Sequence, residues 1–150
     1  MFIKIQTATM KLQENIKSLR LQNKLEELET ISVFIDELSE IWEIPMAMAM
    51  TLNLVLEEAF TNVVNYAFDN KEVHFIQIDF IMRNRELTIK IIDDGKAYDP
   101  TQNTDPDVTL SAEERSIGGL GIFLIRKMMD EVGYARLENK NVLTMKKAIG

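Results

Sequence analysis

Apolar and polar residues recur along this 150-residue chain in patterns that predict a series of strands and helices. Residues 15–22 carry a short alternating pattern that predicts an edge strand, and a weaker pattern over 2–8 predicts another short strand. From residue 24 to 42, the positions of the predicted inner face recur every three or four residues, the spacing of an amphipathic helix, and this series includes Ser32. Pro45 follows where a second helix can begin, because the first helical turn does not need its missing N–H.

The remaining patterns alternate between strand and helix periods. The predicted elements are, in order, a helix over 45–68, strands over 73–82 and 86–92, a helix over 121–131, and strands over 133–138 and 141–147. A polar stretch over 94–117 interrupts this series, and a loop of that length in a small domain is typical of a binding loop or lid. The order predicts an α+β fold, a two-layer α/β sandwich in which a mostly antiparallel mixed sheet carries helices on one face.

Length and composition set limits on the class of protein. A chain of 150 residues, 46% hydrophobic and 27% charged, suits one globular domain over residues 1–150. There is no cysteine and only one histidine, His74, so disulfides, thiolate zinc sites and clusters of several histidines are excluded. The formal net charge of −7 disfavours direct binding to nucleic acid. No apolar run is long enough to span a membrane and no signal peptide is recognised, so we expect a cytoplasmic protein.

The first candidate site is on the helix predicted over 45–68. Glu58 and Asn62 are four residues apart, so their side chains project from one face of this helix. An amide oxygen is a suitable ligand for Mg²⁺, and a carboxylate can accept a proton from an attacking hydroxyl group. A solvated helix face would also show such a pair, but the helix is apolar on nearly every side here, which favours a cleft.

Two further clusters lie near the ends of other elements. Asp93, Asp94 and Gly95 directly follow an apolar strand, where a carboxylate can accept a hydrogen bond from an amine such as that of adenine. The alternative is that these residues form only an ordinary Asp-Gly turn after the strand. Gly118, Gly119 and Gly121 stand where the polar loop opens into a helix, so their backbone N–H groups can bind phosphates, or they form only a hinge. The Lys-Ser/Thr ending of a P-loop is absent.

Together the three clusters resemble the ATP-binding fold shared by gyrase, histidine kinases and MutL. Within that superfamily they are most similar to the serine kinases that act as bacterial anti-sigma factors. Residues 58–62 (Glu-Ala-Phe-Thr-Asn) resemble the helix motif of that family, and residues 91–100 (Ile-Ile-Asp-Asp-Gly-Lys-Ala-Tyr-Asp-Pro) resemble its adenine-site strand and the segment beyond it. Residues 118–125 (Gly-Gly-Leu-Gly-Ile-Phe-Leu-Ile) are similar to its glycine-rich helix start. The likeness extends over about residues 15–147.

The resemblance implies ATP and Mg²⁺ as cofactors and gives each candidate a role. Glu58 would be the catalytic base and Asn62 the Mg²⁺ ligand, while Asp93 would bind the adenine amine with Gly95 beside the ring. The backbone of Gly118, Gly119 and Gly121 would bind the phosphates, with further contacts from Asn65 and Arg115.

Some positions depart from the family pattern. Asn65 stands where many relatives have a basic residue, and Ala97 replaces a second glycine. The last predicted strand has no threonine where relatives place one near adenine, since Thr144 is offset.

The leading hypothesis for function is a protein serine/threonine kinase that phosphorylates an antagonist (anti-anti-sigma) protein and regulates a sigma factor. The implied partners are those two proteins, and a homodimer is compatible with the exposed first strand. Two alternatives are a non-catalytic ATP-gated module that binds a partner protein, and a detached ATPase domain of a histidine kinase. A structural α+β domain with chance motifs is the fourth reading.

Overall fold

The computed structural model describes residues 15–102 and 119–150, so the strand predicted over 2–8 and most of the predicted lid lie outside the described residues. The described elements are β1 (Ile16–Gln22), the 3₁₀ turn η1 (Leu25–Glu27), α2 (Leu28–Ile41), α3 (Met46–Tyr66), β2 (Phe75–Arg83), β3 (Glu86–Asp93), the 3₁₀ turn η2 (Pro100–Gln102), α4 (Gly119–Met128), β4 (Glu131–Leu137) and β5 (Lys140–Ala148).

The described strands form one five-stranded sheet in the order β1-β2-β3-β5-β4, and each neighbouring pair is antiparallel. The β1–β2 and β3–β5 pairings join segments far apart in sequence, whereas β2 and β3 form a hairpin. In the β3–β5 pair, Asp93 is directly opposite Asn141. This register places the last residue of β3 beside the start of β5.

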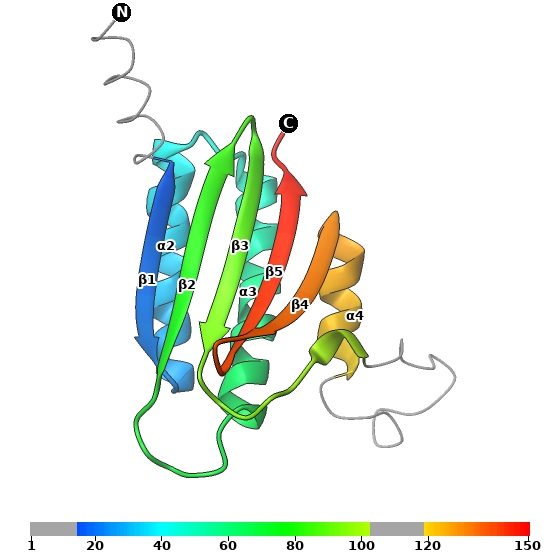
Figure 1. Ribbon diagram of the computed structural model, residues 1–150. Helices are drawn as coiled ribbons and strands as arrows, with labels where there is room; N and C mark the ends of the chain where they lie inside the picture. The colour runs from blue at the N-terminus through cyan, green and yellow to red at the C-terminus, as the bar shows by residue number, and fades with distance from the viewer. Residues whose placement is uncertain (1–14, 103–118) are drawn as a thin grey trace, which may run out of the picture.

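The three α-helices of the described residues pack on one face of the sheet, and no described element covers the other face (Figure 1). Side chains alternate along β2 and β3, so that every second residue is buried under the helices. The resulting core joins these strands to the inward faces of α2, α3 and α4; its largest fully buried side chains include Phe60, Phe80, Ile35, Leu52 and Ile89. The α+β class, with helices on one face of an antiparallel sheet, is confirmed.

Element boundaries differ from the predicted ones by a few residues. The helix predicted over 121–131 begins at Gly119 and ends at Met128, because Asp130 already hydrogen-bonds the last strand through its backbone N–H. On α2, the spacing suggested that Ser32 faces the core, whereas the structure buries Ile31 and exposes Ser32. Burial of the more apolar neighbour requires only a small rotation of the helix.

Candidate functional site

A pocket opens between the C-terminal half of α3, the helix α4, the end of β3 and the start of β5. Its volume is about 450 Å³ when the part open to solvent is included. The described residues that line it are Ala59, Asn62, Val63, Ala67, Ile91, Asp93, Tyr98, Pro100, Ile122, Ile125, Tyr134, Asn141 and Leu143. Most are apolar, and the few polar groups lie at the two ends, which suits a flat ring with polar edges.

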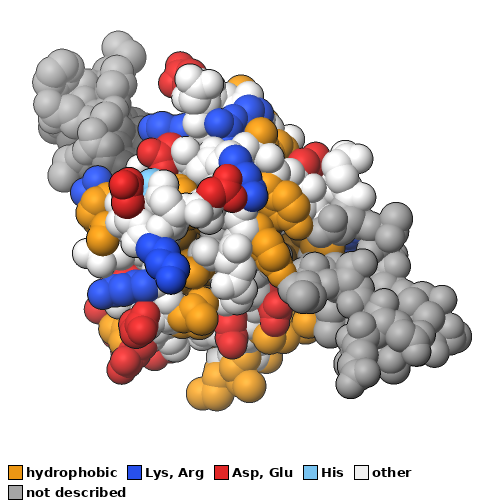
Figure 2. Space-filling model, turned by 90° about the horizontal axis from the view of Figure 1, so that it is seen from below, with side chains coloured by type: hydrophobic (Ala, Val, Ile, Leu, Met, Phe, Trp, Pro, Cys, Tyr) orange, Lys and Arg blue, Asp and Glu red, His pale blue; other side chains and the backbone are white. Residues whose placement is uncertain are grey.

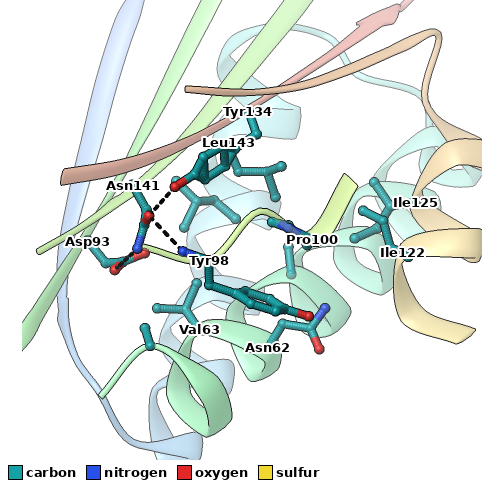
Figure 3. Close-up of a pocket in the computed structure, with 13 residues that line it drawn as sticks. Asn62, Val63, Asp93, Tyr98, Pro100, Ile122, Ile125, Tyr134, Asn141 and Leu143 are labelled. Carbon is teal, nitrogen blue, oxygen red and sulfur yellow. Dashed lines mark hydrogen bonds between the residues drawn. The ribbon is translucent and has the colours of Figure 1, made fainter. Parts of the chain in front are cut away.

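Figure 3 shows how these side chains are arranged. Asp93 and Asn141 lie on one side of the pocket, and Ile122 and Ile125 face them from α4. The ring of Tyr98 lies between the two sides, with its hydroxyl end toward Asn62. Two predicted site residues, Asn62 from α3 and Asp93 from β3, therefore share one pocket.

Asp93 is the buried carboxylate of the pocket, with 4% of its surface exposed. Its Oδ1 accepts hydrogen bonds from the backbone N–H of Gly95 at 2.9 Å and from the side-chain amide of Asn141 at 2.9 Å. No group among the described residues donates to its Oδ2. Burial raises the pKa of the Asp93 carboxyl above its ordinary value, and the hydrogen bonds to Oδ1 partly oppose this shift.

Gly95 lies against the end of α3. A side-chain carbon at this position would lie 2.3 Å from the carbonyl oxygen of Ala67, which also accepts a 2.8 Å hydrogen bond from the backbone N–H of Lys96. The glycine after Asp93 thus allows the chain to pass close to α3. Sequence reasoning had attributed this glycine to the approach of a ring, and the packing against α3 is a second physical reason for it.

Glu58, Asn62 and Gly121 form a second cluster where α3 meets α4. A side-chain carbon on Gly121 would lie 2.8 Å from Oε2 of Glu58 and 3.6 Å from Nδ2 of Asn62. Among the described residues, no group hydrogen-bonds the side chain of Glu58 or of Asn62, and both are half-buried. A carboxylate and an amide are thus available beside a glycine at the start of a helix, near one end of the pocket.

The charge around the pocket is mixed. None of its described lining residues is Lys or Arg. Seen from the end that carries the loops after α3 and β3, acidic and basic side chains are interspersed with hydrophobic ones (Figure 2). At this end, Lys96 pairs with Asp69 at 2.8 Å. Because the described lining has no side-chain cation, neutralising a triphosphate would fall to backbone amides and a metal ion.

The other predicted site residues are placed as follows. Gly119 is the first residue of α4, so the glycine-rich segment does open a helix, whereas Arg115 and Gly118 lie outside the described residues. Asn65 is on α3 but exposed, and it is not among the lining residues. Thr144 lines a hollow on the open face of the sheet, so it does not supply the missing threonine.

Asn141 is the functional candidate that sequence reasoning missed. Its buried amide contacts Asp93, the backbone of Lys96 and Tyr98, and the side chains of Tyr134 and Arg136. The sequence placed this residue only at the start of a strand. A buried asparagine opposite a strand-end aspartate becomes visible only when the register of β3 and β5 is known.

A magnesium ion would fit this site chemically. Mg²⁺ prefers oxygen ligands and usually takes only one or two of them from the protein, with waters and phosphates completing its shell. The amide oxygen of Asn62 is such a ligand, half-buried near the pocket end and without a described partner. Within the described ranges, no group of three or more acidic, His or Cys residues forms an all-protein metal site, and no helix has the length and apolarity of a membrane span.

The fold and this pocket define the class of protein. Residues 21–147 match the family of histidine kinase-like ATPase domains, and the chain belongs to that family. Its curated relatives include the serine/threonine-protein kinase BtrW of Bordetella bronchiseptica, which is 35% identical over 98 residues, or 65% of this chain and 69% of BtrW. The serine-protein kinase RsbW of Listeria monocytogenes is 36% identical over 85 residues, so the match spans about half of each chain. These relatives confirm the predicted resemblance to the anti-sigma factor serine kinases.

Solved structures support the fold. The RsbU and RsbW domains of Rv1364c from Mycobacterium tuberculosis superpose with a TM-score of 0.59 at 12% identity, over 89% of this chain and 32% of that one. The SiaB–SiaC complex from Pseudomonas aeruginosa gives a TM-score of 0.55 at 11% identity, over 97% of this chain and 96% of that one. At such low identity these similarities concern the fold alone.

Proposed function

We propose that this chain, as a single domain over residues 1–150, is an ATP-dependent protein serine/threonine kinase. Its protein substrate would be an anti-anti-sigma (antagonist) protein and its second partner a sigma factor, a proposal supported by relatives named serine-protein kinase and anti-sigma F factor. The observation that supports it most is geometric. One pocket has a carboxylate with an open oxygen at one end and the Asn62 amide at the other, and the Glu58 carboxylate and Gly121 of α4 lie beside that amide.

Adenine would occupy the apolar part of the pocket. Oδ2 of Asp93 would accept a hydrogen bond from the adenine amine, because Oδ1 already has two donors. The aliphatic side chains of Ile91, Ile122 and Leu143 would contact the faces of the ring and exclude water.

The phosphates would lie toward Glu58, Asn62 and Gly121. Backbone N–H groups at the start of α4 would bind them, since the positive end of a helix favours anions. Asn62 would hold Mg²⁺, which when bound with ATP supplies the charge neutralisation that phosphoryl transfer needs. Asn65, Arg115 and Gly118 remain proposed phosphate contacts.

Glu58 would act as the general base. In the reaction, the oxygen of a substrate serine forms a bond to the γ-phosphorus, the bond from that phosphorus to the bridging oxygen of ADP breaks, and the serine proton moves to the Glu58 carboxylate. The carboxylate suits this role because it is half-buried beside Gly121, without a described hydrogen-bond partner. We further propose a cytoplasmic location and a homodimer that uses the exposed edge of β1.

The test uses the full chain with labelled ATP and a recombinant anti-anti-sigma protein. We expect the wild type to bind MgATP and to label a serine of that protein, and Glu58→Gln to bind MgATP while transferring at least about 100-fold more slowly. If the wild type and Glu58→Gln both bind ATP and neither of them transfers phosphate, the chain is an ATP-gated binding module. Absence of ATP binding by the wild type would overturn the proposal as a whole.

A further inference from the structure

Asn141 connects the carboxylate of Asp93 to the loop that follows it. Its amide nitrogen donates to Oδ1 of Asp93 at 2.9 Å and to the carbonyl oxygen of Lys96 at 2.8 Å, so both of its hydrogens are used. The residue is buried, with 6% of its surface exposed. A buried amide with both donors satisfied is fixed in one position, and it fixes the groups that it contacts.

The amide oxygen of Asn141 is surrounded by donors. It accepts hydrogen bonds from the Tyr134 hydroxyl at 2.5 Å, from Nη1 of Arg136 at 3.1 Å and from the backbone N–H of Tyr98 at 3.3 Å. The same Arg136 nitrogen donates to the carbonyl oxygen of Gly95 at 2.8 Å. The loop 95–98 is therefore held at several backbone atoms by residues of β4 and β5. Figure 3 shows the contact between Asn141 and Tyr98.

The orientation of this amide has a chemical consequence for Asp93. Since Asn141 and the backbone of Gly95 both donate to Oδ1, rotation of the carboxylate is opposed, and Oδ2 is the atom left for a ligand. A ligand atom at Oδ2 must then be a hydrogen-bond donor, because an ionised carboxylate only accepts. Among purines, an amino group at position 6 meets this requirement and a carbonyl oxygen there does not.

We propose that Asn141 is a positioning residue that selects the base of the nucleotide. By holding Oδ1 of Asp93 and the loop 95–98, it presents Oδ2 to a purine with a 6-amino group. This inference rests on the proposed function, because it concerns the same pocket. Neither the sequence motifs nor the proposed mechanism gives Asn141 a role.

The first experiment compares ATP with purine riboside triphosphate, which lacks the 6-amino group. Titration calorimetry should show that the wild type prefers ATP by at least about tenfold. In Asn141→Ala, ATP affinity should fall about tenfold while the affinity for the analogue changes little, so the preference is lost. Thr144→Ala is the matched control, since it changes the same strand on the opposite face of the sheet and should keep the preference.

A double-mutant cycle tests whether Asn141 acts through Asp93. In the Asp93→Asn background, Asn141→Ala should change ATP affinity by less than about twofold, because the group it positions has already been altered. Equal losses for ATP and the analogue, or additive effects in the cycle, would show that Asn141 only supports the fold and would overturn the proposal. Asn141→Thr, a smaller polar change, provides the same comparison if Asn141→Ala does not fold.

A measurement without nucleotide separates this proposal from the proposed function. Carbon NMR of the carboxyl group should give a higher pKa for Asp93 in Asn141→Ala than in the wild type, because a hydrogen bond that favours the ionised form is removed. If ATP binds but this pKa does not move, the positioning role is wrong and the kinase proposal stands. If neither nucleotide binds to the wild type, both proposals fail.

Discussion

A side-chain carbon on Gly121 would lie 2.8 Å from Oε2 of Glu58, because the start of α4 packs against α3 at this point. The first prediction follows from this contact. In Gly121→Ala the methyl group should displace the Glu58 carboxylate, which is the free end of a side chain and can move at little cost. We expect unfolding free energy to change by less than about 1 kcal/mol and phosphoryl transfer to fall at least about tenfold.

Gly133→Ala is the control for this substitution. Gly133 lies in β4, and a side-chain carbon there would meet no atom within 4 Å. Transfer rates and urea unfolding should be measured for both variants. Wild-type transfer by Gly121→Ala would mean that Glu58 does not need its present position and would contradict its role as base.

Gly95→Ala should act on stability instead. Its added carbon would lie 2.3 Å from the carbonyl oxygen of Ala67, a backbone atom at the end of α3 that cannot move without shifting the helix. We expect the free energy of unfolding to fall by about 2 kcal/mol or more, measured by urea denaturation. A fall no larger than that of Gly133→Ala would show that the loop after β3 can move away from α3.

Asp93→Asn should separate binding from stability. The new side chain can keep an oxygen for the N–H of Gly95 and the amide of Asn141, but it presents an NH₂ group where Oδ2 was. Two donors would then face each other at the adenine amine, so ATP affinity should fall about 10- to 100-fold in calorimetry. Unchanged affinity would show that Asp93 does not contact the base.

Because the pKa of Asp93 is raised, the stability of Asp93→Asn relative to the wild type should depend on pH. The folded state keeps the Asp93 proton at a pH where the unfolded chain, with its ordinary value of 3.8, has lost it. Folding stability therefore falls as pH rises from 3.8 through the higher folded pKa, and the penalty stays in full above that pKa. Asp93→Asn has no such penalty, so its urea midpoint relative to the wild type should be higher near neutral pH than below pH 3.8. A difference that does not depend on pH would contradict the raised pKa.

Arg85 should stabilise the fold at a place far from the pocket. Its guanidinium donates to the carbonyl oxygens of Trp42 at 2.7 Å and Glu43 at 3.2 Å, just beyond the end of α2. Arg85→Ala leaves these carbonyls without that donor and should lower unfolding free energy by about 1–2 kcal/mol, with ATP affinity unchanged. Arg83→Ala, an exposed change in the same hairpin, should cost less than about 0.5 kcal/mol in urea denaturation.

Local patterns along the chain were enough to locate the elements and the three chemical clusters. Period-two and period-four patterns are local, so they located the strands and helices to within a few residues, and the spacing of Glu58 and Asn62 placed both on one face of α3. The apolar strand before Asp93 and the glycines before Ile122 could be recognised for the same reason, because they too are local patterns.

Which groups share the pocket depends on how distant segments meet in the folded chain. Asn141 lies 48 residues beyond Asp93 in the chain, and the two meet because β5 inserts beside β3 in one particular register. The need for glycine at position 95 likewise depends on where α3 ends in space. Strand order, register and helix–loop packing are set by the burial of the whole core, so no pattern confined to one segment records them.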